Sequence, residues 1–148
     1  PTAFYWREHI TFYPDAKVIL TVRDPNAWYN SISKTIFTAI ENAFLEDATI
    51  PQVPDDAPPF AADQIIVAKT LIADRIFQGR LRDRDFCISQ YHQHIKDVKD
   101  TVPAENLLVF EVKDGWGPLC QFLGADTPNE PFPRANTQEE FSKKMHDS

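Results

Sequence analysis

The feature that most constrains the fold is an apolar run at residues 17–22, Lys-Val-Ile-Leu-Thr-Val, followed directly by Arg23-Asp24-Pro25. A nearly continuous, β-branched run is typical of a strand covered on both faces in a parallel sheet. Asp24 is of a type that caps helix starts, and Pro25 fits the first helical position. The sequence therefore predicts a strand that leads straight into a helix.

Helical patterns flank this strand on both sides. Residues 2–12 mix aromatic and apolar positions with charges, which predicts a short amphipathic helix ending before Tyr13-Pro14. After Pro25, apolar residues recur at spacings of three and four, so we expect a helix with one buried face. That face comprises Tyr29, Ile32, Ile36, Ile40 and Phe44.

Four prolines then predict a semi-rigid surface loop over residues 47–60. Residues 61–78 predict a second helix that ends at Gly79. Its inward positions are Ile65, Val67 or Ala68, Leu71 or Ile72, and Ile76. A third helix is capped by Asp83 or Asp85. Its apolar stripe comprises Ile88, Tyr91, Ile95, Val98 and Val102.

The last part of the chain repeats the order of strand, turn and helix. Residues 107–110, Leu-Leu-Val-Phe, predict a strand, and a short helix then ends at Gly124. Residues 125–148 predict an extended arm. The expected fold class is α/β and helix-rich, with a parallel sheet and flanking helices in a single domain over residues 1–148.

Composition excludes several classes of function. The net charge of −7 and the lack of a Lys/Arg-rich stripe argue against nucleic acid as a partner. No apolar run reaches the ~20 residues that span a bilayer, and the first residues lack the pattern of a signal peptide. We therefore expect no membrane partner and a cytoplasmic location. Cys87 and Cys120 have neither CxxC spacing nor a framework pattern and are expected to be packed, reduced thiols.

Arg23 is the most informative candidate for binding. In open α/β sheets, ligands bind outside the carboxyl ends of the strands, and a guanidinium there can bind a phosphate through paired hydrogen bonds. Ser31, two turns into the following helix, could donate to the same phosphate. The alternative is that Arg23 pairs with a carboxylate and that Ser31 is an ordinary exposed serine.

The stretch from Tyr13 to Ser31 resembles the core of the P-loop sulfotransferase superfamily, in its "sulfotransferase family" branch. In that superfamily a strand ends in Arg, an Asn/Asp-Pro or similar turn follows, and a Ser eight positions on shares the 3′-phosphate of the sulfate donor. Arg23 and Ser31 match in type and spacing. The resemblance continues through residues 106–124 and 131–136, so it covers nearly the whole chain.

The resemblance implies two further nucleotide contacts and a fold. Phe110 falls near the position where cytosolic relatives place an aromatic ring beside the adenine, although a core phenylalanine is the alternative reading. Arg134 falls where a late basic loop reaches the 3′-phosphate, but the glycine-rich continuation of that loop is lacking. The implied fold is the C-terminal two-thirds of a P-loop, NTPase-like domain without its first strand or strands.

One departure from the superfamily affects catalysis. The four glycines, at positions 79, 115, 117 and 124, form no GxxxxGK pattern, so no phosphosulfate-cradling loop occurs in residues 1–148. The general base of the relatives falls at or before Pro1, and His9 reads as a surface histidine. The catalytic residues are therefore unknown, and this chain by itself is expected to be inactive. His92 and His94 lie two apart, a poor spacing for chelation, so no metal is expected.

The resemblance implies transfer of a sulfuryl group from 3′-phosphoadenosine 5′-phosphosulfate to the hydroxyl of a small-molecule acceptor. Whether the chain acts as an enzyme stays open. One alternative is a non-catalytic binding module with a vestigial nucleotide site, which associates with itself through an exposed sheet edge. A small-molecule kinase is a weaker alternative, because the sequence contains no Walker lysine and no magnesium-binding acid after a strand.

Overall fold

The computed structural model describes residues 3–44, 49–54 and 56–133. These residues form two compact units: the first contains residues 3–24 and 91–133, and the second contains the described part of residues 25–90. Helix α5 (Arg84–Thr101) contributes residues to both units. The prediction of a single domain over residues 1–148 stays a prediction.

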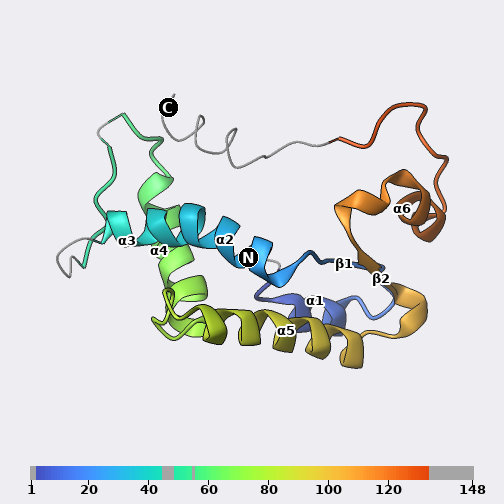
Figure 1. Ribbon diagram of the computed structural model, residues 1–148, viewed down its shortest axis with the longest axis horizontal. Coiled ribbons are helices and arrows are strands. Elements are labelled where there is room, and N and C mark those ends of the chain that lie inside the picture. Colours follow the sequence, from blue (N-terminus) through green and yellow to red (C-terminus); the bar gives the residue numbers. More distant parts are fainter. Residues whose placement is uncertain (1–2, 45–48, 55, 134–148) are drawn as a thin grey trace. The chain divides into compact units, whose positions relative to one another are not determined.

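The first unit is built on two parallel strands, β1 (Val18–Thr21) and β2 (Leu107–Phe110) (Figure 1). Val18 pairs with Leu107, and Thr21 pairs with Phe110. Both predicted strands are confirmed, with β1 one residue shorter at each end than the apolar run. The α/β, helix-rich fold class is confirmed as well.

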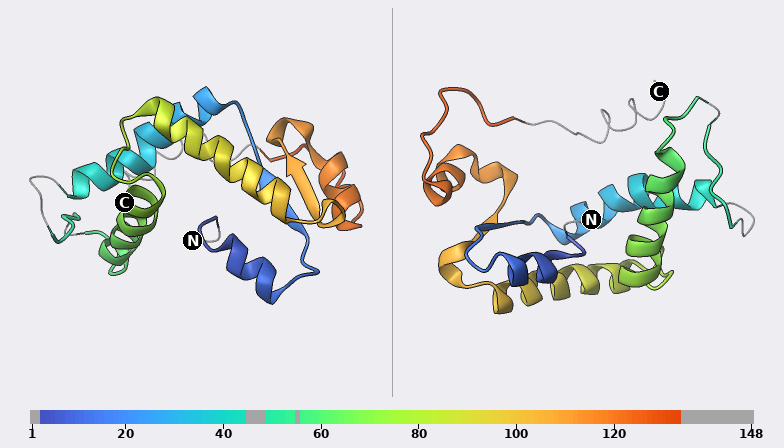
Figure 2. Two further views of the ribbon diagram at one scale, coloured as in Figure 1. Left: turned by 90° about the horizontal axis from the view of Figure 1, so that it is seen from below. Right: turned by 180° about the vertical axis from the view of Figure 1, so that it is seen from behind.

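The core of the first unit forms where α5 meets β1. Leu20 is buried there with Val98 of α5 and with Val102, the residue that follows the end of this helix. Helix α1 (Trp6–Phe12) adds Trp6 and Ile10 to this cluster. Figure 2 shows α1 beside the C-terminal part of α5. The predicted end of this helix, before Tyr13, is confirmed.

Short helical segments lie on both sides of strand β2 in the sequence. A 3₁₀ turn, η4 (Ala104–Asn106), precedes it, and a second, η5 (Val112–Asp114), follows it. Helix α6 (Trp116–Leu123) then ends at Gly124, whose φ of 71° is left-handed, as the glycine at a helix C-terminus predicts. Residues 125–133 form neither helix nor strand.

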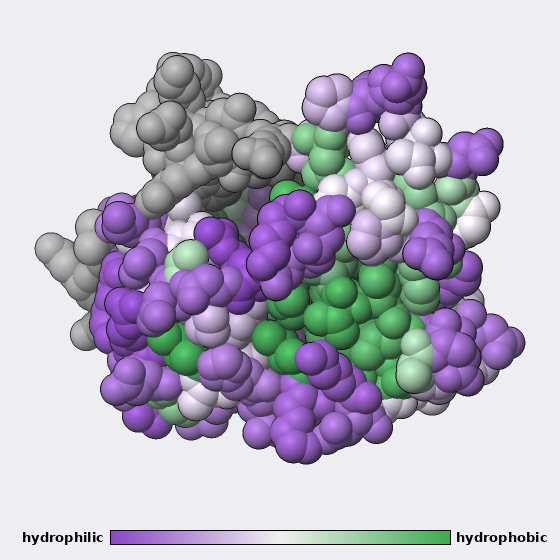
Figure 3. Space-filling view, turned by 45° about the vertical axis from the view of Figure 1, so that its right-hand side comes forward, coloured by the Kyte–Doolittle hydropathy of each residue, from purple (hydrophilic) through white to green (hydrophobic). Residues whose placement is uncertain are grey.

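The prediction that β1 is covered on both faces is wrong, because Ile19 and Thr21, which lie on the same face of the strand, are both exposed. Ile19 is 39% exposed, and Val109 of β2 is exposed to a similar degree. Figure 3 shows hydrophobic residues gathered on one face of the molecule. A run of apolar residues indicates a strand that can be buried. It does not show whether another element covers each of its side chains.

The second unit is helical and contains two segments of π-helix. Helix α2 (Pro25–Ile32) continues through π-helix η1 (Ser33–Phe37) into α3 (Thr38–Ala43). Helix α4 (Ala61–Ala68) continues in the same way into π-helix η3 (Lys69–Ile76). The helix predicted to start at Pro25 and the one predicted over residues 61–78 are both confirmed.

The π-helices change which residues face the core. Because their hydrogen bonds span five residues instead of four, each turn holds more residues and the buried face shifts along the sequence. Phe37 is fully buried, whereas the predicted Ile36 is only partly buried. Phe77 is buried after η3. Of the predicted alternatives Val67 and Ala68, which precede η3, Ala68 packs against the core and Val67 is exposed.

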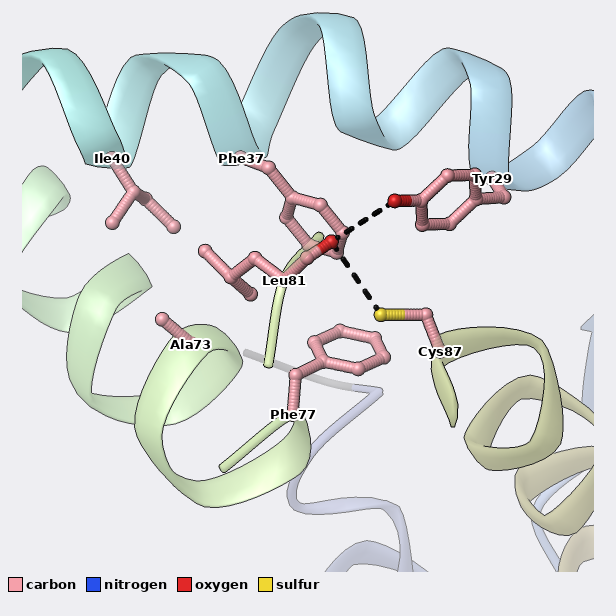
Figure 4. Packing of buried hydrophobic residues seen from close by; sticks show 7 residues of the cluster. All are labelled: Tyr29, Phe37, Ile40, Ala73, Phe77, Leu81 and Cys87. Carbon is pink, nitrogen blue, oxygen red and sulfur yellow. Dashed lines mark hydrogen bonds between the residues drawn. The ribbon is translucent and has the colours of Figure 1, made fainter. Parts of the chain in front are cut away.

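Seven buried residues form the core of this unit (Figure 4). They are Tyr29, Phe37, Ile40, Ala73, Phe77, Leu81 and Cys87. The Tyr29 hydroxyl and the Cys87 thiol both donate to the carbonyl oxygen of Leu81, at 3.2 and 3.7 Å. Both polar groups are thereby satisfied within an apolar cluster.

The N-terminus of α5 is capped by Asp83, which settles the choice between Asp83 and Asp85. The Asp83 carboxylate accepts a hydrogen bond of 3.0 Å from the backbone N–H of Phe86. That bond and the hydrogen bond from Arg80 lower the pKa of Asp83. Both cysteines, Cys87 and Cys120, are buried free thiols. Within the described residues, no helix has the length and hydrophobicity needed to cross a membrane.

Candidate functional site

The carboxyl ends of β1 and β2 lie side by side in the first unit. The ladder continues one residue beyond β1, since the backbone N–H of Val22 donates to the carbonyl oxygen of Phe110 at 2.9 Å. Arg23 is the next residue along the chain. It therefore occupies the carboxyl end of a parallel strand, the position at which open α/β sheets bind their ligands.

The backbone of Arg23 is held by the side chain of Tyr91 in α5. The N–H of Arg23 donates to the Tyr91 hydroxyl oxygen at 2.9 Å, and that hydroxyl donates to the Arg23 carbonyl oxygen at 3.1 Å. Arg23 itself is exposed. Within the part of the chain that the structure describes, its guanidinium makes no ion pair or hydrogen bond, so the alternative of a carboxylate partner is not observed there.

Glu111, the residue after Phe110, forms an ion pair within its own turn. Glu111 pairs with Lys113 at 2.9 Å, and this hydrogen bond and attraction raise the pKa of Lys113. The backbone N–H of Glu111 donates to the Asp114 carboxylate at 3.1 Å. The charge of Glu111 is thus balanced within the turn after β2.

Phe110 lies in the aromatic packing at the end of β2. It is 4% exposed, and its ring centroid lies 5.8 Å from that of Phe132. Phe132 in turn meets Trp116 edge to face at 4.6 Å, and the Trp116 indole donates to the carbonyl oxygen of Glu130 at 2.9 Å. This burial favours the packing role of Phe110. The adenine contact implied by the resemblance stays a prediction.

Of the other predicted nucleotide ligands, the structure describes Ser31 and not Arg134. Ser31 lies in α2, which belongs to the second unit, and is partly buried. Its carbonyl oxygen accepts a hydrogen bond of 2.8 Å from the Thr35 hydroxyl. Its own hydroxyl makes no hydrogen bond to any residue in the described ranges. Arg134 lies outside the described residues.

His9 and His94 of the first unit differ in their exposure. His9 is exposed on α1, as its surface reading predicts. His94 is partly buried and contacts Trp6 edge to face with ring centroids 6.1 Å apart, and burial lowers the pKa of His94. Among residues 3–44, 49–54 and 56–133, no three or more His, Cys, Asp or Glu side chains are placed to hold a metal ion.

Sequence reasoning missed two residues near this strand end. Tyr91 was predicted only as a member of the apolar stripe of α5, and Phe132 was not predicted at all. A tyrosine in an apolar stripe signals that its hydroxyl needs a partner. The partner lies 68 residues away in sequence, and a local pattern does not reveal it.

Comparison with known proteins gives the family. A family model described as "Sulfotransferase domain" matches residues 1–141. The chain is 26% identical over 139 residues to Ava biosynthesis cluster protein M of Aspergillus versicolor, an alignment that covers 94% of this chain and 53% of that protein. The chain thus spans about half the length of this curated relative. Because the family model matches nearly the whole chain, the protein belongs to the sulfotransferase domain family.

Proposed function

We propose that the protein binds 3′-phosphoadenosine 5′-phosphosulfate, with Arg23 as a ligand of the 3′-phosphate, and transfers the sulfuryl group to the hydroxyl of a small-molecule acceptor. The observation that supports this most is the position of Arg23 at the carboxyl end of β1. The Tyr91 hydroxyl holds its backbone, and the preceding residue, Val22, is hydrogen-bonded to Phe110 of β2. Arg23 itself is exposed. Family membership supports the same nucleotide.

The chemistry of Arg23 fits a phosphate ligand. A guanidinium presents several N–H donors in a planar fork that matches two phosphate oxygens, and its charge persists at any physiological pH. The chain as a whole carries a net charge of −7, so an anionic nucleotide needs a local cation. When bound, the nucleotide supplies the activated sulfuryl group. Arg23 binds and orients its far end.

Ser31 and Arg134 are proposed as further ligands of the 3′-phosphate on the strength of the resemblance alone. Ser31 offers a hydroxyl donor without a partner in the described ranges, eight residues after Arg23. Arg134 would bring a second guanidinium from beyond residue 133. Phe110 is proposed beside the adenine only on the strength of the resemblance, and its burial limits how much of its ring a ligand could contact.

The proline-rich segment and α4 are proposed to wall the acceptor site. Several apolar side chains are exposed there, among them Ile50, Phe60 and Val67. Such side chains suit a small acceptor with an apolar body. The name of the relative, a biosynthesis cluster protein, agrees with a small-molecule acceptor. Exchanging residues 47–60 should change the choice of acceptor and leave nucleotide affinity intact; the reverse result would refute this assignment.

The second candidate function is a non-catalytic module that associates with itself. The exposed Ile19 and Val109 of the two-stranded sheet favour it, because uncovered apolar strands tend to acquire partners. Light scattering tests this candidate. A concentration-dependent dimer with no nucleotide affinity would support the module and contradict the sulfotransferase proposal.

The nucleotide itself is tested by comparing ligands. Adenosine 3′,5′-bisphosphate, which retains the 3′-phosphate, and ATP with Mg²⁺ are each titrated into the protein by calorimetry. We expect the bisphosphate to bind at least about tenfold more tightly, because charge-assisted hydrogen bonds to its 3′-phosphate are absent with ATP. Tighter binding of ATP would favour a kinase instead.

A further inference from the structure

The hydroxyl of Tyr91 replaces a neighbouring strand at the end of β1. Up to Val22, the backbone of this segment is paired with β2, ending in the 2.9 Å bond to Phe110. At Arg23 the Tyr91 hydroxyl takes over, accepting from the N–H at 2.9 Å and donating to the carbonyl oxygen at 3.1 Å. One side chain thus satisfies both backbone polar groups of a single residue.

Such a pair of bonds fixes the direction in which the arginine side chain leaves the backbone. The two bonds hold the peptide groups on both sides of the Arg23 Cα, so the Cα–Cβ direction is set by the backbone. Without them the residue beyond the ladder would sample other backbone conformations. Ordering that residue has a cost in conformational entropy, which binding would then have to offset.

The helix that carries Tyr91, α5, is itself packed against β1. Val98, two turns further along α5, is buried against Leu20 of β1, and Val102 joins the same cluster. The same helix therefore packs on the strand through apolar contacts and holds the residue beyond its end through a hydroxyl. Helix α5 thus ties the backbone position of Arg23 to the position of β1.

We propose that Tyr91 is a positioning residue for phosphate recognition, acting through the backbone of Arg23. This inference rests on the proposed role of Arg23 as a ligand of the nucleotide 3′-phosphate. It assigns to Tyr91 no contact with the nucleotide. Its hydroxyl holds the Arg23 backbone at the carboxyl end of β1 and so limits the positions that the guanidinium can reach.

The test measures selectivity for the 3′-phosphate. Adenosine 3′,5′-bisphosphate and adenosine 5′-monophosphate differ only in that phosphate, so the ratio of their dissociation constants reports its recognition. The ratio is measured by calorimetry for the unaltered protein, Tyr91→Phe, Arg23→Ala and Tyr29→Phe. Tyr29→Phe is the matched control, because it also removes a hydroxyl bonded to a backbone carbonyl, at Leu81, in the core of the second unit.

The expected results differ among the variants. Tyr91→Phe should reduce the selectivity ratio about three- to tenfold, the effect of about one hydrogen bond, while Tyr29→Phe should leave it within twofold. Hydrogen exchange at the Arg23 amide should also become faster in Tyr91→Phe, since the acceptor of that N–H is removed. A loss of stability alone would weaken both ligands equally and leave the ratio unchanged.

Two outcomes overturn the inference and are distinguishable. If Arg23→Ala lowers the ratio but Tyr91→Phe does not, Arg23 is a phosphate ligand that needs no positioning by Tyr91. If Arg23→Ala leaves the ratio unchanged, the proposed function of Arg23 fails, and the positioning role fails with it. In that second case, faster exchange of the Arg23 amide in Tyr91→Phe would still establish the hydrogen bond as structural.

Discussion

The rings of Phe37 and Phe77 meet edge to face in the core of the second unit, with centroids 5.2 Å apart. Phe37 ends π-helix η1, and Phe77 follows π-helix η3. The contact therefore joins two helical segments at the points where their winding changes (Figure 4). Aromatic pairs of this geometry add to the stabilisation that burial alone provides.

Replacing Phe37 by alanine should strongly destabilise this unit. The side chain is fully buried, so its removal leaves a cavity and should lower the free energy of unfolding by about 3–5 kcal/mol. Urea denaturation followed by circular dichroism measures the change. Phe12→Ala is the control: Phe12 is 79% exposed, and its loss should cost less than about 0.5 kcal/mol. Equal effects of the two substitutions would contradict the assigned core.

Cys87 should make stability depend on alkaline pH. Burial raises the pKa of its thiol from 9.0 to about 11. The folded protein therefore keeps the proton between these values while the unfolded chain loses it, so stability falls as pH rises from about 9 to about 11. Below pH 9 the contribution of the neutral thiol is fully present.

Comparison with Cys87→Ala isolates this effect from other groups that titrate in the same range. Thermal unfolding midpoints of both proteins are measured from pH 8 to pH 11. The unaltered protein should lose more stability than the alanine variant over this range. Parallel pH profiles would show that the thiol is not protected by burial.

Ser31→Ala should weaken binding of adenosine 3′,5′-bisphosphate at least about tenfold, through loss of one hydrogen bond to a charged group. Stability should stay nearly unchanged, because alanine suits a helix at least as well as serine. Ser89→Ala is the matched control, since Ser89 is an exposed helical serine that bonds the backbone of its own helix at Phe86. Calorimetric titration of both variants checks the prediction, and equal affinities would remove Ser31 from the site.

Phe110→Leu separates the two roles considered for this residue. Because Phe110 is buried against Phe132, we expect the free energy of unfolding to fall by about 1 kcal/mol and the affinity for adenosine 5′-monophosphate to stay within twofold. A clear loss of affinity in a folded variant would instead support contact with the adenine, since stacking on an aromatic ring contributes about 1–3 kcal/mol per base.

Local sequence patterns predicted the helices and strands well, because the signals involved act over short stretches of sequence. The apolar run at residues 17–22, the Asp-Pro pair after it and Gly124 each act within a few residues, and β1, α2 and the end of α6 follow from them. The predicted face of the helix after Pro25 reaches the core, but Phe37 and Phe77 were not predicted there. The predictions assumed 3.6 residues per turn, and the π-helices shift Phe37 and Phe77 into the core.

The candidate site was predictable only in part. The strand end identified Arg23 because parallel sheets bind ligands there whatever their sequence. The hydroxyl of Tyr91 and the ring of Phe132 depend on contacts between distant segments. Periodicity treats Tyr91 as an apolar residue and gives no information on the partner of its hydroxyl. A structure was needed to place it on the backbone of Arg23.

The most direct test of the account is calorimetric titration of adenosine 3′,5′-bisphosphate into the protein and into Arg23→Ala. Saturable binding by the unaltered protein, reduced at least about tenfold by the substitution, is the predicted result, because a charge-assisted pair of hydrogen bonds is removed. Circular dichroism confirms that both proteins are folded. Equal affinity in both, or no binding by the folded, unaltered protein, would contradict the role of Arg23 in nucleotide recognition.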